Sequence, residues 1–237
     1  MMAPGHLLFL DTETTGLPAR WDRPYAEKQA WPYVAQLGWL IYTQEGELVK
    51  TTKAYLQIPP GSMPASATAI HGLSSEFMRV HGRDPKAVLR LLLQDLARYQ
   101  PRVIGHFLQL DFHVLGAAFA RADLGNPLPD LPQFCTMQPT WPSLQGEPQQ
   151  RHLRLHELHE LLFNEPMERL HDAFVDAQAT ARCFFELRRR GLISPELMEN
   201  QPRLTTPTQQ IKPHPFRWLF LLASAGSFPL VAWLVYG

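Results

Sequence analysis

The sequence predicts an α/β fold, in which helices pack against a mixed β-sheet. Three observations lead to this class. A short apolar strand near the N-terminus ends in acidic residues, a β-rich meander with a tight turn follows, and the remainder alternates helices with short strands. A meander gives antiparallel strands and helix–strand alternation gives parallel ones, so we expect both kinds of pairing in one sheet.

The sequence predicts five strands: one near the N-terminus, a hairpin pair and two shorter strands. Residues 6–11 are mostly apolar, which is typical of a buried strand. Residues 33–43 and 49–58 are rich in β-branched and aromatic side chains, and a Glu-Gly turn between them predicts a hairpin. Two shorter strands are expected at residues 103–105 and 134–137.

The clearest expected helix begins at Pro85 and runs to Tyr99. Its leucines recur on one side, as in a helix that buries one face, and proline is favoured at the first helical position. Further helices are expected at residues 65–72, 110–122, 153–163 and 174–190.

The charge of the chain is balanced overall but not along its length. Residues 1–199 carry 19 Lys and Arg against 22 Asp and Glu, whereas residues 200–237 carry three basic residues and no acid. The net charge of the chain therefore gives no indication of a nucleic-acid partner. Any polyanion must bind at a local site, where metal ions supply much of the positive charge.

Cys135 and Cys183 are the only cysteines, and they form no CxxC pair. Two buried free thiols in a reducing compartment are favoured over a single disulfide. The apolar run near the N-terminus is too short for the core of a signal peptide.

Asp11 and Glu13 are the first candidate site residues. Side chains at i and i+2 of a strand point to the same face, so the two carboxylates project together from the end of the first strand. Such a pair repels, and a divalent cation such as Mg²⁺ or Mn²⁺ removes the conflict. In the alternative interpretation, one acid caps a turn and the other faces solvent.

Three later residues are candidates for the same site. Asp111 lies between a short strand and an apolar helix, where it either interacts with the helix N-terminus or faces a metal. Asp172 occupies a helix N-cap position. Asp176 lies one turn further, among small residues that let the helix approach a sheet, and an acid on such a face is unusual unless it is paired or binds a metal. His171 could reach this site.

Together these residues resemble the DEDDh family of 3′–5′ exonucleases. An Asp-x-Glu motif, an Asp about a hundred residues later and a His-x4-Asp motif carry the resemblance, which covers roughly residues 5–190. Within the family the chain is similar to the proofreading epsilon subunit of bacterial DNA polymerase III and its stand-alone relatives, which share an Ile-His-Gly segment with Ile70-His71-Gly72. The implied fold is ribonuclease H-like: a mixed five-stranded sheet, with three antiparallel strands and then two parallel ones, flanked by helices.

The resemblance also implies a mechanism. Asp11, Glu13 and Asp176 hold one Mg²⁺ or Mn²⁺ ion, and Asp11 bridges to a second, which Asp111 helps to hold through water. Two such ions clamp the attacking and leaving oxygens of a phosphodiester. His171 accepts the proton of the attacking water, and the product is a nucleoside 5′-monophosphate from a 3′ end.

The substrate residues follow from the same resemblance. The terminal nucleotide is expected to lie between two segments, and the rest of the strand to contact aromatic faces. These residues are Thr14, Thr15, Gly16, Leu17, Ile70, His71, His106 and Phe107.

The chain departs from the family pattern at three positions. Phe107, Leu110 and Cys135 stand where the family often has Asn, Phe and Asp, which affects the expected substrate more than the chemistry. The sister type with Tyr-x3-Asp is disfavoured, because Asp172 stands four residues before Asp176.

Single-stranded DNA ends are the leading expected substrate. RNA ends or short oligoribonucleotides are the close rival, and a catalytically silent nucleic-acid or protein-binding module is the rival of a different class. No polymerase-binding motif is evident, so a polymerase partner stays unknown. A zinc site at His152, His156 and His159 is disfavoured, because their spacing does not fit a His-Glu-x-x-His helix.

The C-terminal region predicts a separate function. We expect an exonuclease domain at residues 1–199, a linker at 200–216 and a hydrophobic helix at 217–237 that serves as a tail anchor. Residues 218–237 contain no charged side chain and are about long enough to cross a bilayer. This predicts a nuclease on the cytoplasmic side of a membrane; the alternatives are a helix that folds back onto the domain, a partner-binding segment and a soluble cytoplasmic protein.

Overall fold

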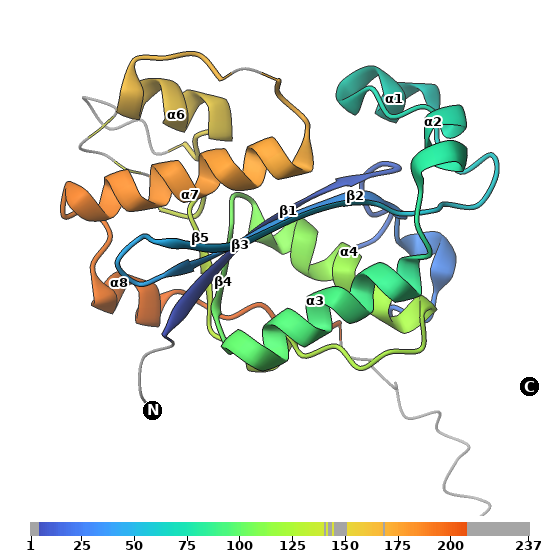
Figure 1. Ribbon diagram of the computed structural model, residues 1–237, viewed down its shortest axis with the longest axis horizontal. Coiled ribbons are helices and arrows are strands. Elements are labelled where there is room, and N and C mark those ends of the chain that lie inside the picture. Colours follow the sequence, from blue (N-terminus) through green and yellow to red (C-terminus); the bar gives the residue numbers. More distant parts are fainter. Residues whose placement is uncertain (1–4, 140, 142–143, 145–150, 168, 208–237) are drawn as a thin grey trace, which may run out of the picture. The chain divides into compact units, whose positions relative to one another are not determined.

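A mixed sheet of five strands forms the centre of the computed structural model, with the strand order β3-β2-β1-β4-β5 (Figure 1). β1 pairs antiparallel with β2, and β2 pairs antiparallel with β3, whereas β1–β4 and β4–β5 are parallel. This confirms the expected mixed sheet. The strands are β1 (His6–Thr14), β2 (Val34–Thr43), β3 (Leu48–Tyr55), β4 (Arg102–Gly105) and β5 (Gln133–Cys135).

The structure describes residues 5–139, 141, 144, 151–167 and 169–207. Residues up to Pro207 form one compact unit. The predicted tail anchor at 217–237 lies outside the described residues. Within the described ranges, no helix combines the length and the apolar character that crossing a membrane requires.

Helices cover both faces of the sheet (Figure 1). Leu8 and Leu10 of β1 belong to the core that α3 and α4 complete, whereas Leu7 and Phe9 belong to the core that α6 and α7 complete. The alternation along β1 follows from the two-residue period of a strand. The helices are α1 (Ala65–His71), α2 (Ser75–His81), α3 (Pro85–Tyr99), α4 (Leu108–Arg121), α6 (Leu155–Phe163), α7 (Ala173–Arg189) and α8 (Pro195–Asn200), with short 3-10 turns at Lys28–Ala30 and Leu128–Asp130.

The first strand is longer than the sequence predicts. It continues through the acidic motif to Thr14, because residues 12–14 pair with the start of β2. Asp11 and Glu13 therefore lie within the paired part of β1 rather than at its expected end. Two short helices, α2 and α8, were not expected from the sequence.

The segment after residue 200 packs on the domain instead of leaving it. The side-chain amide of Gln201 donates to the carbonyl of Cys135 at 3.0 Å and its oxygen accepts from the N–H of Cys135 at 2.5 Å. The N–H of Leu204 donates to the side chain of Gln133 at 3.0 Å. Composition assigns residues 200–207 to a linker, but Gln201 and Leu204 are held against β5 by these side chain–backbone hydrogen bonds.

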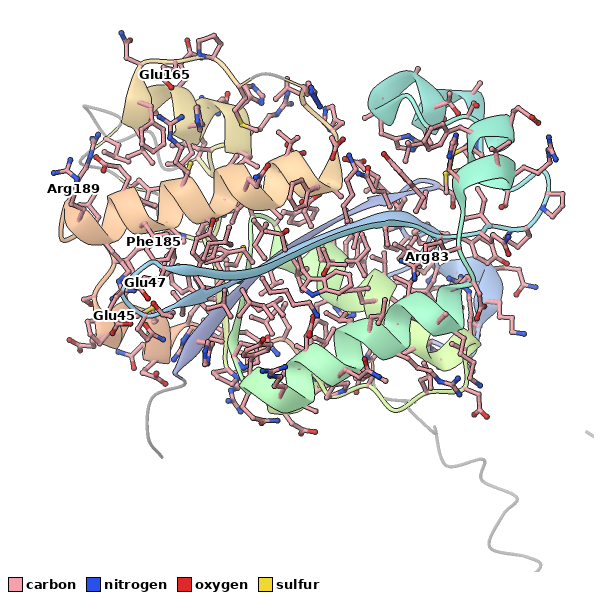
Figure 2. All side chains as sticks on the ribbon, in the orientation of Figure 1. Glu45, Glu47, Arg83, Glu165, Phe185 and Arg189 are labelled. Carbon is pink, nitrogen blue, oxygen red and sulfur yellow. The ribbon has the colours of Figure 1, made fainter. Side chains whose placement is uncertain are left out.

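Figure 2 shows Phe185 of α7 beside the β2–β3 hairpin that carries Glu45 and Glu47. The ring of Phe185 lies 5.3 Å from the ring of Tyr42, and a side chain at Gly46 would meet it at 3.5 Å. This end of the sheet is formed by apolar packing, whereas Glu13 pairs with Gln36 near the opposite end of β2, where α7 begins. The two cysteines are buried and free, as expected.

Candidate metal-dependent active site

Four carboxylates from three separate elements meet at the end of β1. Asp11 and Glu13 come from β1, Asp111 from the first turn of α4 and Asp176 from the first turn of α7. The charges of Asp111, Asp176 and Glu13 all act on Asp11. The sequence therefore identified residues that the fold does bring together.

Burial and mutual repulsion shape the acidity of this cluster. Burial, followed by the charges of Asp111, Asp176 and Glu13, raises the pKa of Asp11 well above its usual value. Burial and the charge of Asp176 raise the pKa of Glu13 to about 8. Burial likewise raises the pKa of Asp111 and of Asp176 to about 7. Without a cation, the cluster would therefore hold protons at neutral pH.

Asp111 reaches the cluster from the opposite side of β1. It is 3% exposed, and the hydroxyl of Thr12 donates to its Oδ1 at 2.7 Å. Thr12 lies between the two β1 acids in sequence, so its side chain points to the other face, where α4 packs. Sequence reasoning missed Thr12, although a polar residue between two site acids on a strand is the signal that could have found it.

Asp172 has a different role from its neighbours. It caps α7 by accepting from the N–H groups of Phe174 and Val175, and it also accepts from Gln36 at 2.9 Å and from Lys53 at 2.6 Å. Although burial opposes ionisation, the hydrogen bonds from Lys53 and Gln36 hold the pKa of Asp172 below its usual value. Its charge is therefore compensated by protein groups, as predicted for an N-cap.

Gly38 allows α7 to approach the sheet at the level of the site. It pairs with Asp11 across β1 and β2. A Cβ at this position would lie 2.5 Å from the Cα and 2.6 Å from the nitrogen of Phe174, and 2.7 Å from the carbonyl oxygen of Ala173. Only glycine leaves room for this contact, and the start of α7 carries Asp176. Sequence reasoning missed Gly38, although glycine inside a strand is a known sign of close backbone approach.

Asp176 provides the observation that bears most directly on a metal. Its Oδ1 is buried and makes no hydrogen bond. Ligand atoms of Glu13, His171 and Asp176 all lie within 4.8 Å of one another. A buried carboxylate oxygen without a donor is costly unless a cation takes that place. The donor set is hard oxygen plus one imidazole, so these residues fit a divalent ion such as Mg²⁺ or Mn²⁺.

His171 lies at the exposed rim of the cluster. Its backbone adopts a left-handed conformation, with φ of 63°. Such a conformation is strained for histidine and is often found at functional positions. The exposed imidazole is accessible to water while it remains next to Glu13 and Asp176.

The residues predicted to hold the terminal nucleotide differ in their environments: some are fixed by hydrogen bonds and others are exposed. His71 accepts the N–H of Leu73 at Nδ1, so its Nε2 donates to the carbonyl of Thr14 at 3.2 Å. Leu17 is 71% exposed and Ile70 is 59% exposed. The hydroxyl of Thr14 donates to the carbonyl of Gly16, and the hydroxyl of Thr15 accepts from the N–H of Tyr33. The segments on either side of this hydrogen-bonded turn therefore expose two apolar side chains, Leu17 and Ile70, to solvent.

His106 lies in a place that does not suit the predicted contact with substrate. It is 9% exposed, and its ring nitrogens lie 3.0 Å from the hydroxyl of Thr136 and 2.9 Å from the carbonyl of Leu153. Burial lowers its pKa to about 4, so it stays neutral. We assign it a structural role, in which it ties the end of β4 to later segments. Phe107 beside it is 37% exposed.

His152, which precedes α6, and His159, which lies in it, are engaged by protein groups. His159 Nδ1 lies 3.0 Å from the carbonyl of Glu165, and Arg182 lies 3.0 Å from its Nε2. His152 Nδ1 lies 3.0 Å from the carbonyl of Met137. In the described part of the chain, the three-ligand group of Glu13, His171 and Asp176 does not include these histidines.

Comparisons with known proteins give the same fold. The structure of exonuclease I superimposes with a TM-score of 0.65 and 18% identity, covering 82% of this chain and 42% of that one. Escherichia coli exonuclease I in complex with a dT13 oligonucleotide gives 0.64 and 18%, covering 82% and 43%. A 3′-exonuclease that recognises the 3′ end of a histone mRNA stem-loop gives 0.62 and 12%, covering 87% and 96%. This chain thus spans less than half the length of exonuclease I.

The sequence itself matches a family profile described as Exonuclease (RNase_T), over residues 8–184. No curated protein sequence matches it. The predicted resemblance to DEDD-type exonucleases is confirmed, whereas the narrower likeness to the epsilon subunit is not specifically shown by these matches. The matched region includes all four acids and His171, and it establishes that the chain belongs to the Exonuclease (RNase_T) family.

Proposed function

We propose that this protein is a metal-dependent 3′–5′ exonuclease that removes nucleoside 5′-monophosphates from single-stranded DNA ends. The convergence of Asp11, Glu13, Asp111 and Asp176, with a buried Asp176 oxygen left without a donor, is the observation that supports it. A binding module would gain nothing from four carboxylates that repel one another and any phosphate. Membership of an exonuclease family adds independent support.

The carboxylates and the histidine of the site would have different roles. Asp11, Glu13 and Asp176 would hold one divalent ion, and Asp11 with Asp111 a second. When bound, the ions supply positive charge for the phosphodiester and lower the pKa of the attacking water. His171, at the exposed rim, would take the proton of that water on an imidazole nitrogen and pass it to solvent.

The terminal nucleotide would lie between two exposed apolar side chains. Leu17 follows β1, which carries Asp11 and Glu13, and Ile70 belongs to α1 and precedes His71; both side chains are largely exposed. His71 ties α1 to the carbonyl of Thr14, so the two walls of this site are linked by a hydrogen bond. Apolar contact with the base and sugar requires no particular sequence, as expected for an enzyme that degrades any end.

RNA ends are a second candidate substrate. The observation in favour is coverage: this chain spans 96% of the 3′-exonuclease that recognises the histone mRNA stem-loop, but only 43% of exonuclease I bound to dT13. The 2′-hydroxyl would have to be sensed by residues outside the acid cluster.

The decisive experiment uses the purified full-length chain with Mg²⁺ or Mn²⁺. Single-stranded DNA and RNA of one sequence, labelled at either the 5′ or the 3′ end, would be followed for release of 5′-mononucleotides. We expect a ladder shortened from the 3′ end, no activity in EDTA, and no activity for Asp176→Asn. Release from the 5′ end, or unchanged turnover by Asp176→Asn, would refute the proposal. The ratio of the cleavage rate on DNA to the cleavage rate on RNA of the same sequence decides which is the preferred substrate.

We also propose, from sequence alone, that residues 218–237 attach the enzyme to a membrane on its cytoplasmic side. The support is an uncharged segment with Trp218 at one end and Trp233 and Tyr236 near the other. Full-length protein should sediment with membranes and resist high-salt extraction, whereas recovery in the supernatant would refute the anchor.

A further inference from the structure

Five aromatic rings contact one another beside the acid cluster. Trp21 lies 6.2 Å from Phe107 and 5.8 Å from His113, and Trp31 stacks on His113 at 5.5 Å, measured between ring centroids. Tyr25 adds a hydroxyl 2.9 Å from His113 Nδ1. His113 belongs to α4, the helix that carries Asp111, Phe107 immediately precedes that helix, and the other three rings belong to the connection between β1 and β2.

That connection, residues 18–32, is firmly docked on α4. The guanidinium of Arg121 donates to the carbonyl of Pro32 at 2.7 Å and to that of Lys28 at 2.9 Å, and it also contacts the carbonyl of Trp31. Gly116 of α4 lies directly under the ring of Tyr25, since a Cβ there would meet it at 2.5 Å. The loop is therefore a fixed wall next to the site.

Phe107 is the ring that faces outward. It immediately precedes α4, four residues before Asp111, with φ of 66° and a side chain that is 37% exposed. A left-handed backbone is unfavourable for phenylalanine and persists only where the surrounding structure enforces it. This conformation exposes an apolar ring to solvent close to Asp111. Packing of the ring does not explain why this strained conformation is adopted.

The loop presents aromatic surface and a net charge of only +1, since three basic residues are offset by two acids. Arg20 is paired with Asp22 at 2.6 Å and Arg23 with Glu27 at 3.6 Å. Acids also outnumber basic residues in the domain. A nucleic acid that approaches this side therefore gains little from backbone electrostatics. Aromatic faces can supply the missing affinity, because every base stacks on them.

We propose that an unpaired nucleobase, upstream of the scissile phosphate, stacks on the ring of Phe107, while Trp21, tilted 57° to that ring, supports it from the side. We call this surface the shelf. The inference rests on the proposed nuclease function and extends it. It assigns residues 18–32 to substrate selection, since a base held in a duplex cannot lie flat on the shelf. Single-stranded ends are thereby preferred, and this part of the binding is not screened by salt.

The test is a double-mutant cycle between the protein ring and the base. Binding of a fluorescent oligothymidylate is measured by anisotropy in Mg²⁺, with every protein carrying Asp176→Asn to prevent turnover. An abasic site is moved stepwise upstream from the 3′ end. With Phe107 present, one position should show a loss of about tenfold, since stacking contributes roughly 1–3 kcal/mol per base. With Phe107→Asn, the loss at that position should fall to about twofold or less.

Phe107→Asn is chosen because asparagine accepts a left-handed backbone more readily than phenylalanine. The melting temperature should therefore be kept or raised, so that weaker binding cannot be ascribed to unfolding. Phe107→Tyr retains the ring, so the abasic site should reduce its affinity as much as it does with Phe107 present. Trp21→Phe should show part of that reduction.

Two outcomes would overturn the shelf. In the first, an abasic site lowers the affinity equally with and without the Phe107 ring at every position. In the second, Phe107→Asn lowers the affinity by the same factor for intact and abasic oligonucleotides. Failure of the nuclease function is read separately, from wild-type protein that releases no mononucleotide. An abasic signature that vanishes in Phe107→Asn would support the shelf even then.

Discussion

Gly38→Ala tests whether the close approach of α7 to the sheet is what assembles the site. The added Cβ would lie 2.5–2.7 Å from backbone atoms of Phe174 and Ala173, where ordinary contacts begin at 3.4 Å. Because the clash is with backbone, no side chain can rotate away, and the start of α7 must move by about 1 Å. Overpacking of this kind costs about 1–3 kcal/mol. A displacement of about 1 Å at a catalytic group can cost about a hundredfold in rate.

The assay combines thermal unfolding with single-turnover cleavage of a 3′ end. We expect Gly38→Ala to lower the melting temperature by roughly 3–10 °C. The protein should stay folded at 25 °C, yet cleave about a hundredfold more slowly, because Asp176 moves with α7. Gly125→Ala is the matched control, since a Cβ there meets nothing within 4 Å. Wild-type rate and stability for Gly38→Ala would refute the reasoning, because α7 would then tolerate displacement without consequence for the acids.

Three further predictions concern the charges of the site. Asp176→Asn should abolish cleavage yet raise the melting temperature in EDTA at pH 8, measured by differential scanning fluorimetry; a lower value would contradict the repulsion. In EDTA, stability of the wild type should fall as pH rises from about 5 to 8. The folded-state pKa values, about 7 for Asp111 and about 8 for Glu13, exceed those of the unfolded chain, so the folded state loses its extra protons in this window. A saturating amount of Mn²⁺ should flatten this slope, and an unchanged slope would count against metal binding. His171→Gln should slow single-turnover cleavage by about 10²–10⁴-fold, while the Mn²⁺-induced thermal shift persists; loss of that shift would make His171 a ligand rather than a base.

Sequence reasoning predicted the site because its logic is local or periodic. The two-residue period of a strand placed Asp11 and Glu13 on one face, and the cap position separated Asp172 from Asp176. The same reasoning predicted five strands in the right order along the chain, since hairpin and helix–strand patterns are visible in composition. It ended β1 too early, because nothing local shows that residues 12–14 pair with β2.

What the sequence could not predict depends on tertiary contacts. α2 has only seven residues, too few for a stable helix alone, and it forms because Phe77 packs on Tyr55 and Met78 is buried. His106 was expected to contact the substrate because the family resemblance and its aromatic ring suggested stacking on a base. Its burial against Thr136 and Leu153 arises from segments 30 and 47 positions away. The aromatic contacts of residues 18–32 likewise require α4 to be in place.

The acid cluster also explains why the fold can exist before its ions arrive. Among the described residues, no Lys or Arg forms an ion pair with Asp11, Glu13, Asp111 or Asp176; Lys53, the cation close to α7, is paired with Asp172 instead. Raised pKa values mean that protons neutralise part of the cluster when metal is absent. Protons and divalent ions therefore compete for the same oxygens, and metal affinity must rise with pH over the range in which metal-free stability falls. Repulsion among the ionised carboxylates destabilises the metal-free protein. A bound cation would relieve this repulsion, so the same repulsion favours cation binding.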